Sequence, residues 1–153
     1  MRNRGRRPAA RARRQHDIAV PTAIAVGGAS GALARHGLAT LLPHGAGGFP
    51  WATFLTNVVG CLAIGVLMVL LTEVVMSPHR LLRPFLGIGL LGGFTTFSTY
   101  AVQVHQLTGT GQVVMALAYL LGTVTAALVA VAVGTASTRR LTHAGRSTPE
   151  ERS

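Results

Sequence analysis

The chain has 153 residues, of which 49% are apolar and 12% charged, and its mean hydropathy is +0.45. A soluble domain carries about twice that charged share, whereas this length accommodates about four membrane-spanning helices of roughly 20 residues each. The composition therefore predicts an all-α membrane protein in contact with lipid. The net charge of +10 is the difference between 14 arginines and four acidic residues, and the arginines lie mostly in tails and one loop. This placement argues against nucleic acid as a partner.

Four apolar stretches are predicted to cross the membrane and to form a single transmembrane domain over residues 18–134. Residues 1–17 are predicted to form an arginine-rich tail without regular structure, because a run of like charges cannot be buried. A polar tail, 135–153, is expected to follow the last span. The predicted spans are 18–42, 51–75, 85–104 and 113–133.

The arginines outside the spans are distributed asymmetrically. The amino-terminal tail holds seven, the loop between the second and third spans two, and the carboxy-terminal tail four, whereas the other two loops hold none. Cytoplasmic segments of membrane proteins are rich in arginine and lysine. We therefore expect a multi-pass protein of the cell membrane with both termini in the cytoplasm.

The first span carries a small-residue stripe and one arginine. Ala23, Gly27 and Gly31 recur every four residues, a spacing that predicts close contact with another helix. Arg35 lies inside the same span, where a cation requires water, a partner or an anion. The alternative is that its long side chain extends to the outer headgroups.

The third span carries the most informative segment. Gly92 and Gly93 precede a run of threonine and serine near the midpoint of the span, at Thr95. Paired glycines weaken a helix, and hydroxyl groups can satisfy backbone groups that a break releases. We therefore expect a helix that is broken at the bilayer midplane and offers carbonyl oxygens to a cation. The alternative is that the small residues only permit close helix packing.

Aromatic and neutral polar side chains recur at helical spacing in three spans. Phe97 and Tyr100 lie three residues apart, and the positive edges of their rings suit an anion path; ordinary lipid or helix packing is the alternative. Neutral hydrogen-bond donors suit a small, strongly hydrated anion, and polar contacts between helices are the alternative. These donors are Thr53 and Asn57 on the second span and Tyr119 and Thr123 on the fourth.

The residue combinations that common enzyme chemistry needs are missing from the sequence. Cys61 is the single cysteine, so it forms no internal disulfide and no cysteine metal cluster. Glu73, near the cytoplasmic end of the second span, is the one carboxylate inside a span. No nucleophile–base pair, phosphate-binding loop or zinc-ligand spacing is present, so we expect no enzymatic activity.

Three segments together resemble the CrcB/Fluc family of fluoride channels, and the resemblance covers residues 20–134. The segments are Gly-Gly-Ala-Ser-Gly-Ala-Leu-Ala-Arg (27–35), Thr-Phe-Leu-Thr-Asn-Val-Val-Gly (53–60) and Gly-Gly-Phe-Thr-Thr-Phe-Ser-Thr-Tyr (92–100). The resemblance implies a dimer of antiparallel subunits whose third helices cross at a structural sodium ion. It further implies that fluoride leaves the cytoplasm passively, which lowers fluoride toxicity.

The same resemblance implies roles for individual residues. The backbone carbonyls of Gly92 and Thr95 of each subunit are expected to bind the sodium ion. Tyr100 departs from the family pattern, which has a second phenylalanine there, and Gln103 stands near the place of an acidic residue. The residues expected to line the fluoride pore are Phe97, Tyr100, Asn57, Thr53, Tyr119 and Thr123, with Arg35 in the vestibule.

An antiparallel pair of identical chains requires insertion in both orientations. Thirteen arginines on one side and none on the other predict a single orientation, and hence a heterodimer with an oppositely oriented relative. The alternative is that the tails bias insertion only partly and the chain pairs with itself. Two other functions remain open, a four-span multidrug exporter, which needs a membrane carboxylate, and a non-conducting membrane assembly subunit.

Overall fold

The computed structural model describes residues 7–45, 47–75 and 78–144, and residues 7–17 by their backbone alone. All regular structure within these ranges is helical. The elements in chain order are α1 (Arg7–Leu41), α2 (Trp51–Val69), the π-helical segments η1 (Leu70–Val74) and η2 (Pro84–Leu91), α3 (Gly92–Phe94), α4 (Ser98–Gly109) and α5 (Val113–Ala144).

Among the residues that the structure describes, four helical segments are long and apolar enough to cross a membrane, as expected of an all-helical, multi-pass membrane protein. The third of them combines η2, α3 and α4, and the second combines α2 and η1. The four segments are Ile18–Leu41, Trp51–Val74, Pro84–Gly109 and Val113–Ala144.

The first helix begins earlier than the sequence predicts. Residues 7–17 continue α1 as helix, so the prediction of a tail without regular structure is wrong for them. Alanine and arginine both favour helix, and extending an existing helix costs far less than starting a new one. The first six residues of the predicted tail lie outside the described residues.

The last helix also extends beyond its predicted end at residue 133. α5 continues to Ala144 and takes in a run of polar residues that we assigned to the second tail. The difference has the same cause, because extending an existing helix costs little free energy. Residues 145–153 lie outside the described part of the chain.

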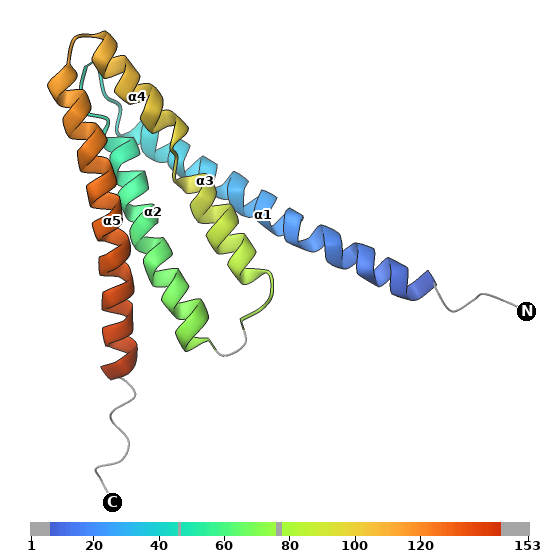
Figure 1. Ribbon diagram of the computed structural model, residues 1–153. Coiled ribbons are helices and arrows are strands. Elements are labelled where there is room, and N and C mark those ends of the chain that lie inside the picture. Colours follow the sequence, from blue (N-terminus) through green and yellow to red (C-terminus); the bar gives the residue numbers. More distant parts are fainter. Residues whose placement is uncertain (1–6, 46, 76–77, 145–153) are drawn as a thin grey trace, which may run out of the picture.

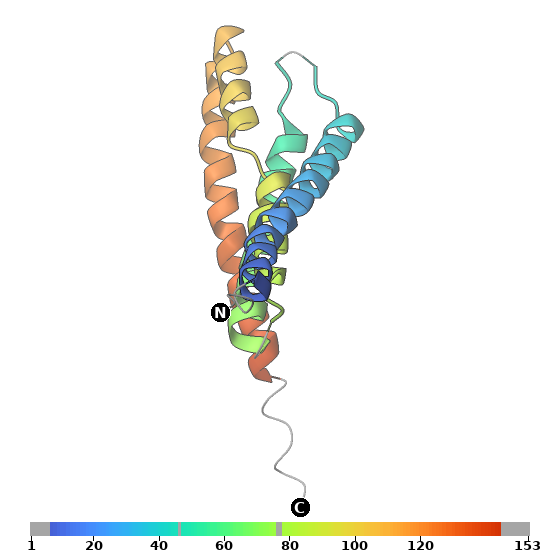
Figure 2. The same cartoon turned by 90° about the vertical axis from the view of Figure 1, so that its right-hand side faces the viewer.

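The helices pack in two pairs. α2 lies along α5, and α1 packs against η2 and α3, while α4 meets the beginning of α5. Figure 1 shows that α1 is strongly inclined and that its amino-terminal part runs away from the other helices. Seen in Figures 1 and 2, the start of α1, the connection from η1 to η2 and the end of α5 lie toward one end of the molecule, and the other two connections lie at the opposite end.

Glycines allow α1 to approach the third segment at backbone distance. A Cβ atom on Gly27 would overlap the carbonyl oxygen of Phe85, and one on Gly31 would overlap the carbonyl oxygen of Leu90. Any larger residue must therefore separate the two helices. The predicted close contact along this stripe is confirmed at both glycines.

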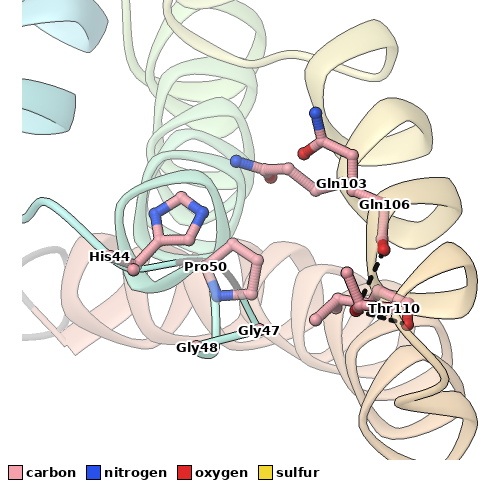
Figure 3. A pocket seen from close by; sticks show the side chains of 9 residues that line it. His44, Gly47, Gly48, Pro50, Gln103, Gln106 and Thr110 are labelled. Atoms are coloured by element: carbon pink, nitrogen blue, oxygen red, sulfur yellow. Dashed lines mark hydrogen bonds between the residues drawn. The ribbon is translucent and has the colours of Figure 1, made fainter.

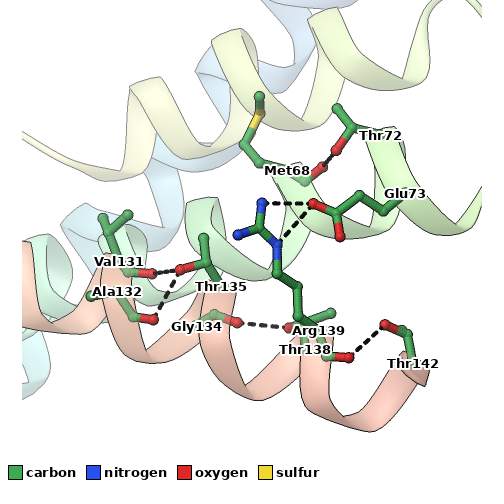
Figure 4. Close-up of polar contacts among 10 residues, drawn as sticks. All are labelled: Met68, Thr72, Glu73, Val131, Ala132, Gly134, Thr135, Thr138, Arg139 and Thr142. Carbon is green, nitrogen blue, oxygen red and sulfur yellow. Dashed lines mark hydrogen bonds and ion pairs between the residues drawn. The ribbon is translucent and has the colours of Figure 1, made fainter. Parts of the chain in front are cut away.

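The seam between α2 and α5 closes with an ion pair. Along the seam, a Cβ atom on Gly65 would meet the carbonyl oxygen of Val131 at 2.5 Å. At its end, Arg139 approaches Glu73 with Nη2 2.7 Å and Nε 2.9 Å from the same carboxylate oxygen, Oε1 (Figure 4). The one carboxylate inside a predicted span is thus paired with an arginine of α5.

Candidate functional site

The third segment is interrupted between α3 and α4, at residues 95–97. Thr95 has an extended conformation (φ −75°, ψ 157°), which turns its carbonyl away from the helical direction. Eight residues of η2 and three of α3 precede the interruption, and twelve residues of α4 follow it. The backbone therefore departs from helical geometry near the middle of a segment long enough to span a membrane.

Threonine hydroxyls are hydrogen-bonded to backbone groups on both sides of the interruption. The Thr95 hydroxyl donates to the Leu91 carbonyl at 3.0 Å. The Thr96 hydroxyl oxygen accepts the N–H of Thr99 at 3.2 Å, which satisfies one of the unpaired donors at the start of α4. The sequence predicts this use of the hydroxyl groups.

Asn57 of α2 holds the interruption through the backbone of Thr96. Its Nδ2 donates to the Thr96 carbonyl at 3.0 Å, and its Oδ1 accepts the Thr96 N–H at 2.9 Å. One turn further along α2, a Cβ atom on Gly60 would overlap the methyl group of Thr95, so the helix carries glycine where the loop is closest. The amide uses one of its two Nδ2 hydrogens in this contact and keeps the other.

Arg35 reaches the same region from α1. Its Nε donates to the Gly93 carbonyl at 3.3 Å, and its Nη1 lies 3.5 Å from the Thr99 hydroxyl. Of the two placements that the sequence leaves open, the side chain turns toward the third segment. It lines a cavity of about 180 Å³ together with Thr53 of α2 and Thr96.

A second cavity, of about 240 Å³, lies where the third segment meets α2 and α5. Its aromatic lining is unequal, because Phe97 is 79% exposed in the single chain whereas Tyr100 is 4% exposed. The ring centroids of these two residues are 5.9 Å apart. The cavity is lined by Asn57, Cys61, Ile64, Thr95, Thr96, Phe97, Tyr100, Thr123, Val124 and Ala127.

Two hydroxyl groups on this side of the molecule differ in their partners. Tyr100 donates to the Leu120 carbonyl at 2.6 Å, so its hydroxyl is occupied by the backbone of α5. The buried hydroxyl of Thr123 has no hydrogen-bond partner among the described residues. A buried polar group without a partner is costly, and its presence in a cavity lining is typical of a ligand position.

Tyr119 lies behind the cavity and is completely buried. Its hydroxyl donates to Oε1 of Gln103 at 2.9 Å, and its ring centroid is 5.2 Å from that of Tyr100. Tyr119 therefore continues an aromatic series that begins at Phe97.

Comparison with known proteins assigns the chain to a family. The family model described as CrcB-like protein, Camphor Resistance (CrcB), matches residues 22–135. The chain belongs to the CrcB-like family. The resemblance predicted from the sequence is confirmed.

Curated relatives of this CrcB-like protein carry ion-channel names. It is 55% identical to "Fluoride-specific ion channel FluC 2" of Nocardia farcinica over 85% of the chain and 92% of the relative. It is 52% identical to "Fluoride-specific ion channel FluC 1" of Streptomyces coelicolor, over 80% and 79%. It is 42% identical to "Fluoride-specific ion channel FluC" of a Synechocystis strain, over 80% and 94%. Ion channels are not enzymes, which supports the expectation that the chain lacks enzymatic activity.

The structure of this CrcB-like protein gathers most of the predicted site residues around the interruption. Arg35 and Thr53 share one cavity, Tyr119 lies behind the other, and Gly92 is exposed at the start of α3. Reasoning from the sequence missed Thr96, which lines both cavities and receives the Asn57 amide. The run of threonine and serine residues indicated that the third segment is important, but it did not single out Thr96. The second cavity brings together Asn57, Thr95, Phe97, Tyr100 and Thr123.

Proposed function

We propose that this CrcB-like protein is a subunit of a fluoride-specific channel through which fluoride leaves the cytoplasm passively. The relatives' names support this function. The observation that carries it is the cavity at the interruption of the third segment, which combines neutral donors with aromatic rings. No residue lining that cavity is charged, so its walls neither hold an anion too tightly nor repel it.

The lining offers what a small hydrated anion needs. Fluoride must exchange water hydrogen bonds for protein ones, and the free Nδ2 hydrogen of Asn57 and the unpartnered hydroxyl of Thr123 are neutral donors. The edge of the exposed Phe97 ring adds partial positive charge without a full cation. Arg35 is proposed to attract the anion from the neighbouring cavity, because it is the one arginine among the described residues of that cavity's lining, where His36 also lies.

The interruption itself is proposed to lie at the bilayer midplane and to hold a structural sodium ion. The carbonyl oxygens of Gly92 and Thr95 are the proposed ligands, and neutral oxygens of this kind suit a hard cation. The extended backbone at Thr95 fits this role, because it frees a carbonyl from the helical pattern. One chain supplies two such oxygens, so the site requires two from a second subunit. The ion would support the interface and would not be transported.

The proposed assembly is an antiparallel dimer in the cell membrane. Thirteen arginines favour one orientation of this chain, with both termini in the cytoplasm, and therefore a heterodimer with an oppositely oriented relative. The described ends of α1 and α5 and the connection from η1 to η2 gather at one end of the molecule, which agrees with this topology (Figures 1 and 2). Five of the thirteen arginines lie outside the described residues, namely Arg2, Arg4, Arg6, Arg146 and Arg152.

Mapping the accessibility of tags at both termini in native membranes tests the orientation. We expect labelling from the cytoplasmic side alone, because the positive charge is concentrated on one side. Substantial labelling of both orientations contradicts the heterodimer and favours self-pairing.

The ion pair of Glu73 weighs against the multidrug exporter. A proton-coupled exporter of cations needs a membrane carboxylate that is free to exchange its proton, and Glu73 is bound to Arg139 at the end of the bundle. It also lies outside the linings of both cavities at the interruption.

Fluoride efflux from liposomes tests the proposed function. The chain is reconstituted alone and together with an oppositely oriented relative, with protein-free liposomes as the control. We expect efflux with the pair, and with the chain alone only if it pairs with itself. Absence of efflux under both conditions contradicts the channel and favours a non-conducting assembly subunit.

A further inference from the structure

A further cavity, of about 370 Å³, lies between the loop that follows α1 and the carboxy-terminal half of α4. It shares no lining residue with the two cavities at the interruption. Figure 3 shows His44 and Pro50 on one side of it and Gln103, Gln106 and Thr110 on the other. It lies at the end of the molecule where the connecting loops contain no arginine.

The loop that carries His44 is held against the helices. Gly47 has a positive φ of 85°, and a Cβ atom there would overlap the side-chain amide of Gln112. The Phe49 ring packs edge-on against Tyr119, with centroids 5.3 Å apart and an interplanar angle of 84°. On this side the cavity is therefore bounded by a loop whose residues Gly47 and Phe49 contact Gln112 and Tyr119.

Hydrogen-bond donors converge on this cavity. The Gln103 side chain is buried and its Oε1 accepts the Tyr119 hydroxyl, while its amide nitrogen has no hydrogen-bond partner in the described part of the chain. Thr110 donates its hydroxyl to carbonyls of its own helix, at 3.2 Å and 3.1 Å, and offers no proton to a ligand. The available donors are the amide nitrogens of Gln103 and Gln106 and the imidazole of His44.

His44 is the one histidine among the described residues that line the cavity, and an imidazole carries a positive charge when it is protonated. Among those described residues there is no carboxylate, lysine or arginine, so a protonated His44 has no anionic partner there. On the elements around it, α4 also carries His105, which does not line the cavity, and α5 carries Tyr119. The helix that leads into the loop, α1, carries Arg35 and His36, which line the neighbouring cavity and not this one. Protonation of His44 therefore gives the cavity a net positive charge.

The cavity adjoins the aromatic series that leads to the interruption. Gln103 contacts Tyr119, whose ring lies 5.2 Å from Tyr100, and Tyr100 in turn lies 5.9 Å from Phe97. On the basis of the fluoride channel proposed above, we propose that this cavity binds a small monovalent anion such as fluoride at the arginine-poor mouth of the pore. The anion binds more tightly when His44 is protonated.

The test compares the protein as reconstituted for fluoride efflux with its H44Q and H105Q variants. Initial rates are measured against fluoride concentration at about pH 5.5 and about pH 7.5, on either side of ordinary histidine titration. A positive charge on His44 close to the bound anion is expected to lower the half-saturating fluoride concentration about fivefold at the lower pH. We expect this change in the native protein and in H105Q, and none in H44Q. Protein-free liposomes at each pH provide the leak to be subtracted.

The same pH response in H44Q and in the native protein overturns the proposal, and so does its loss in H105Q. Direct binding is measured separately by following the imidazole resonances of the detergent-solubilised protein as sodium fluoride is added. The resonance that H44Q removes is expected to shift with fluoride, and no shift overturns the site. If efflux is absent in every variant the channel proposal fails, whereas this titration still decides whether the cavity binds the anion.

Discussion

Two hydrogen bonds from one amide fix the backbone at the interruption. Replacing Asn57 with leucine removes both and leaves the N–H and carbonyl of Thr96 without partners. We expect a loss of about 2 kcal/mol in unfolding free energy, measured by thermal unfolding in detergent. Cys61→Ser is the matched control, because this residue lies one turn along α2 in the same cavity lining. An equal effect of both substitutions contradicts the special role of Asn57.

The hydroxyl of Tyr100 is hydrogen-bonded to the backbone of α5, beside the cavity proposed to conduct fluoride. It donates to the Leu120 carbonyl, so the departure from phenylalanine at this position adds a structural contact and leaves the ring to line the cavity. Tyr100→Phe is expected to cost about 1 kcal/mol of stability and to leave fluoride efflux unchanged. A large increase in efflux would show that the hydroxyl obstructs the pore.

Tyr119→Phe serves as a comparison for that substitution. It leaves the buried Oε1 of Gln103 without its donor, which is expected to cost about 2 kcal/mol. Thermal unfolding in detergent, measured for both variants, is expected to rank it as the more damaging of the two. The reverse order contradicts the hydrogen-bond assignment.

At the scale of the elements, the contact between α1 and the third segment depends on glycine. A Cβ atom on Gly31 would overlap the Leu90 carbonyl and lie 2.7 Å from the backbone nitrogen of Phe94. We expect Gly31→Ala to destabilise the protein by about 2–3 kcal/mol, measured by thermal unfolding in detergent. Gly37→Ala lies on the same helix with nothing within 4 Å and is expected to be neutral or slightly stabilising. Equal behaviour of the two variants would contradict this packing.

The sequence predicts the elements well where apolar composition alone defines them. The second span is predicted over 51–75 and observed over Trp51–Val74, because a predominantly apolar stretch without charged residues begins directly after Pro50. The predicted tails were wrong where α1 begins at Arg7 and where α5 continues to Ala144. Charged residues indicate that a segment is exposed, but an exposed segment can still be helical.

Contacts between side chains of different helices could not be predicted from the sequence. The asparagine was identified as a polar position, but its partner Thr96 depends on how α2 is rotated against the third segment. The bond between Tyr119 and Gln103 joins residues sixteen positions apart on two helices, and helical spacing within one element carries no signal for it. Spacing thus predicts which residues share a helix face, whereas the packing of helices decides which of them meet.

At the scale of the whole molecule, one chain contains only part of a pathway. Phe97 is 79% exposed and the cavity beside it is open, so the proposed second subunit would complete its wall. Arg35 and His44 lie on either side of the carboxy-terminal end of α1 at Leu41, so their two cavities lie toward the same end of the molecule. The cavity beside Phe97 is lined by α2 residues further from that end, Asn57, Cys61 and Ile64. We expect an anion to cross by passing between neutral donors, with positive charge supplied toward the end where α1 ends.

The most direct test of the account is fluoride efflux through the Thr123→Val variant. Valine keeps the shape of threonine and removes a buried hydroxyl that has no partner among the described residues, so stability is expected to be unchanged or higher. Thr135→Val is the control on the same helix, because that hydroxyl bonds only to carbonyls of α5. We predict that Thr123→Val lowers fluoride efflux about tenfold while Thr135→Val does not. Native efflux in a folded Thr123→Val protein would contradict a fluoride path along this cavity.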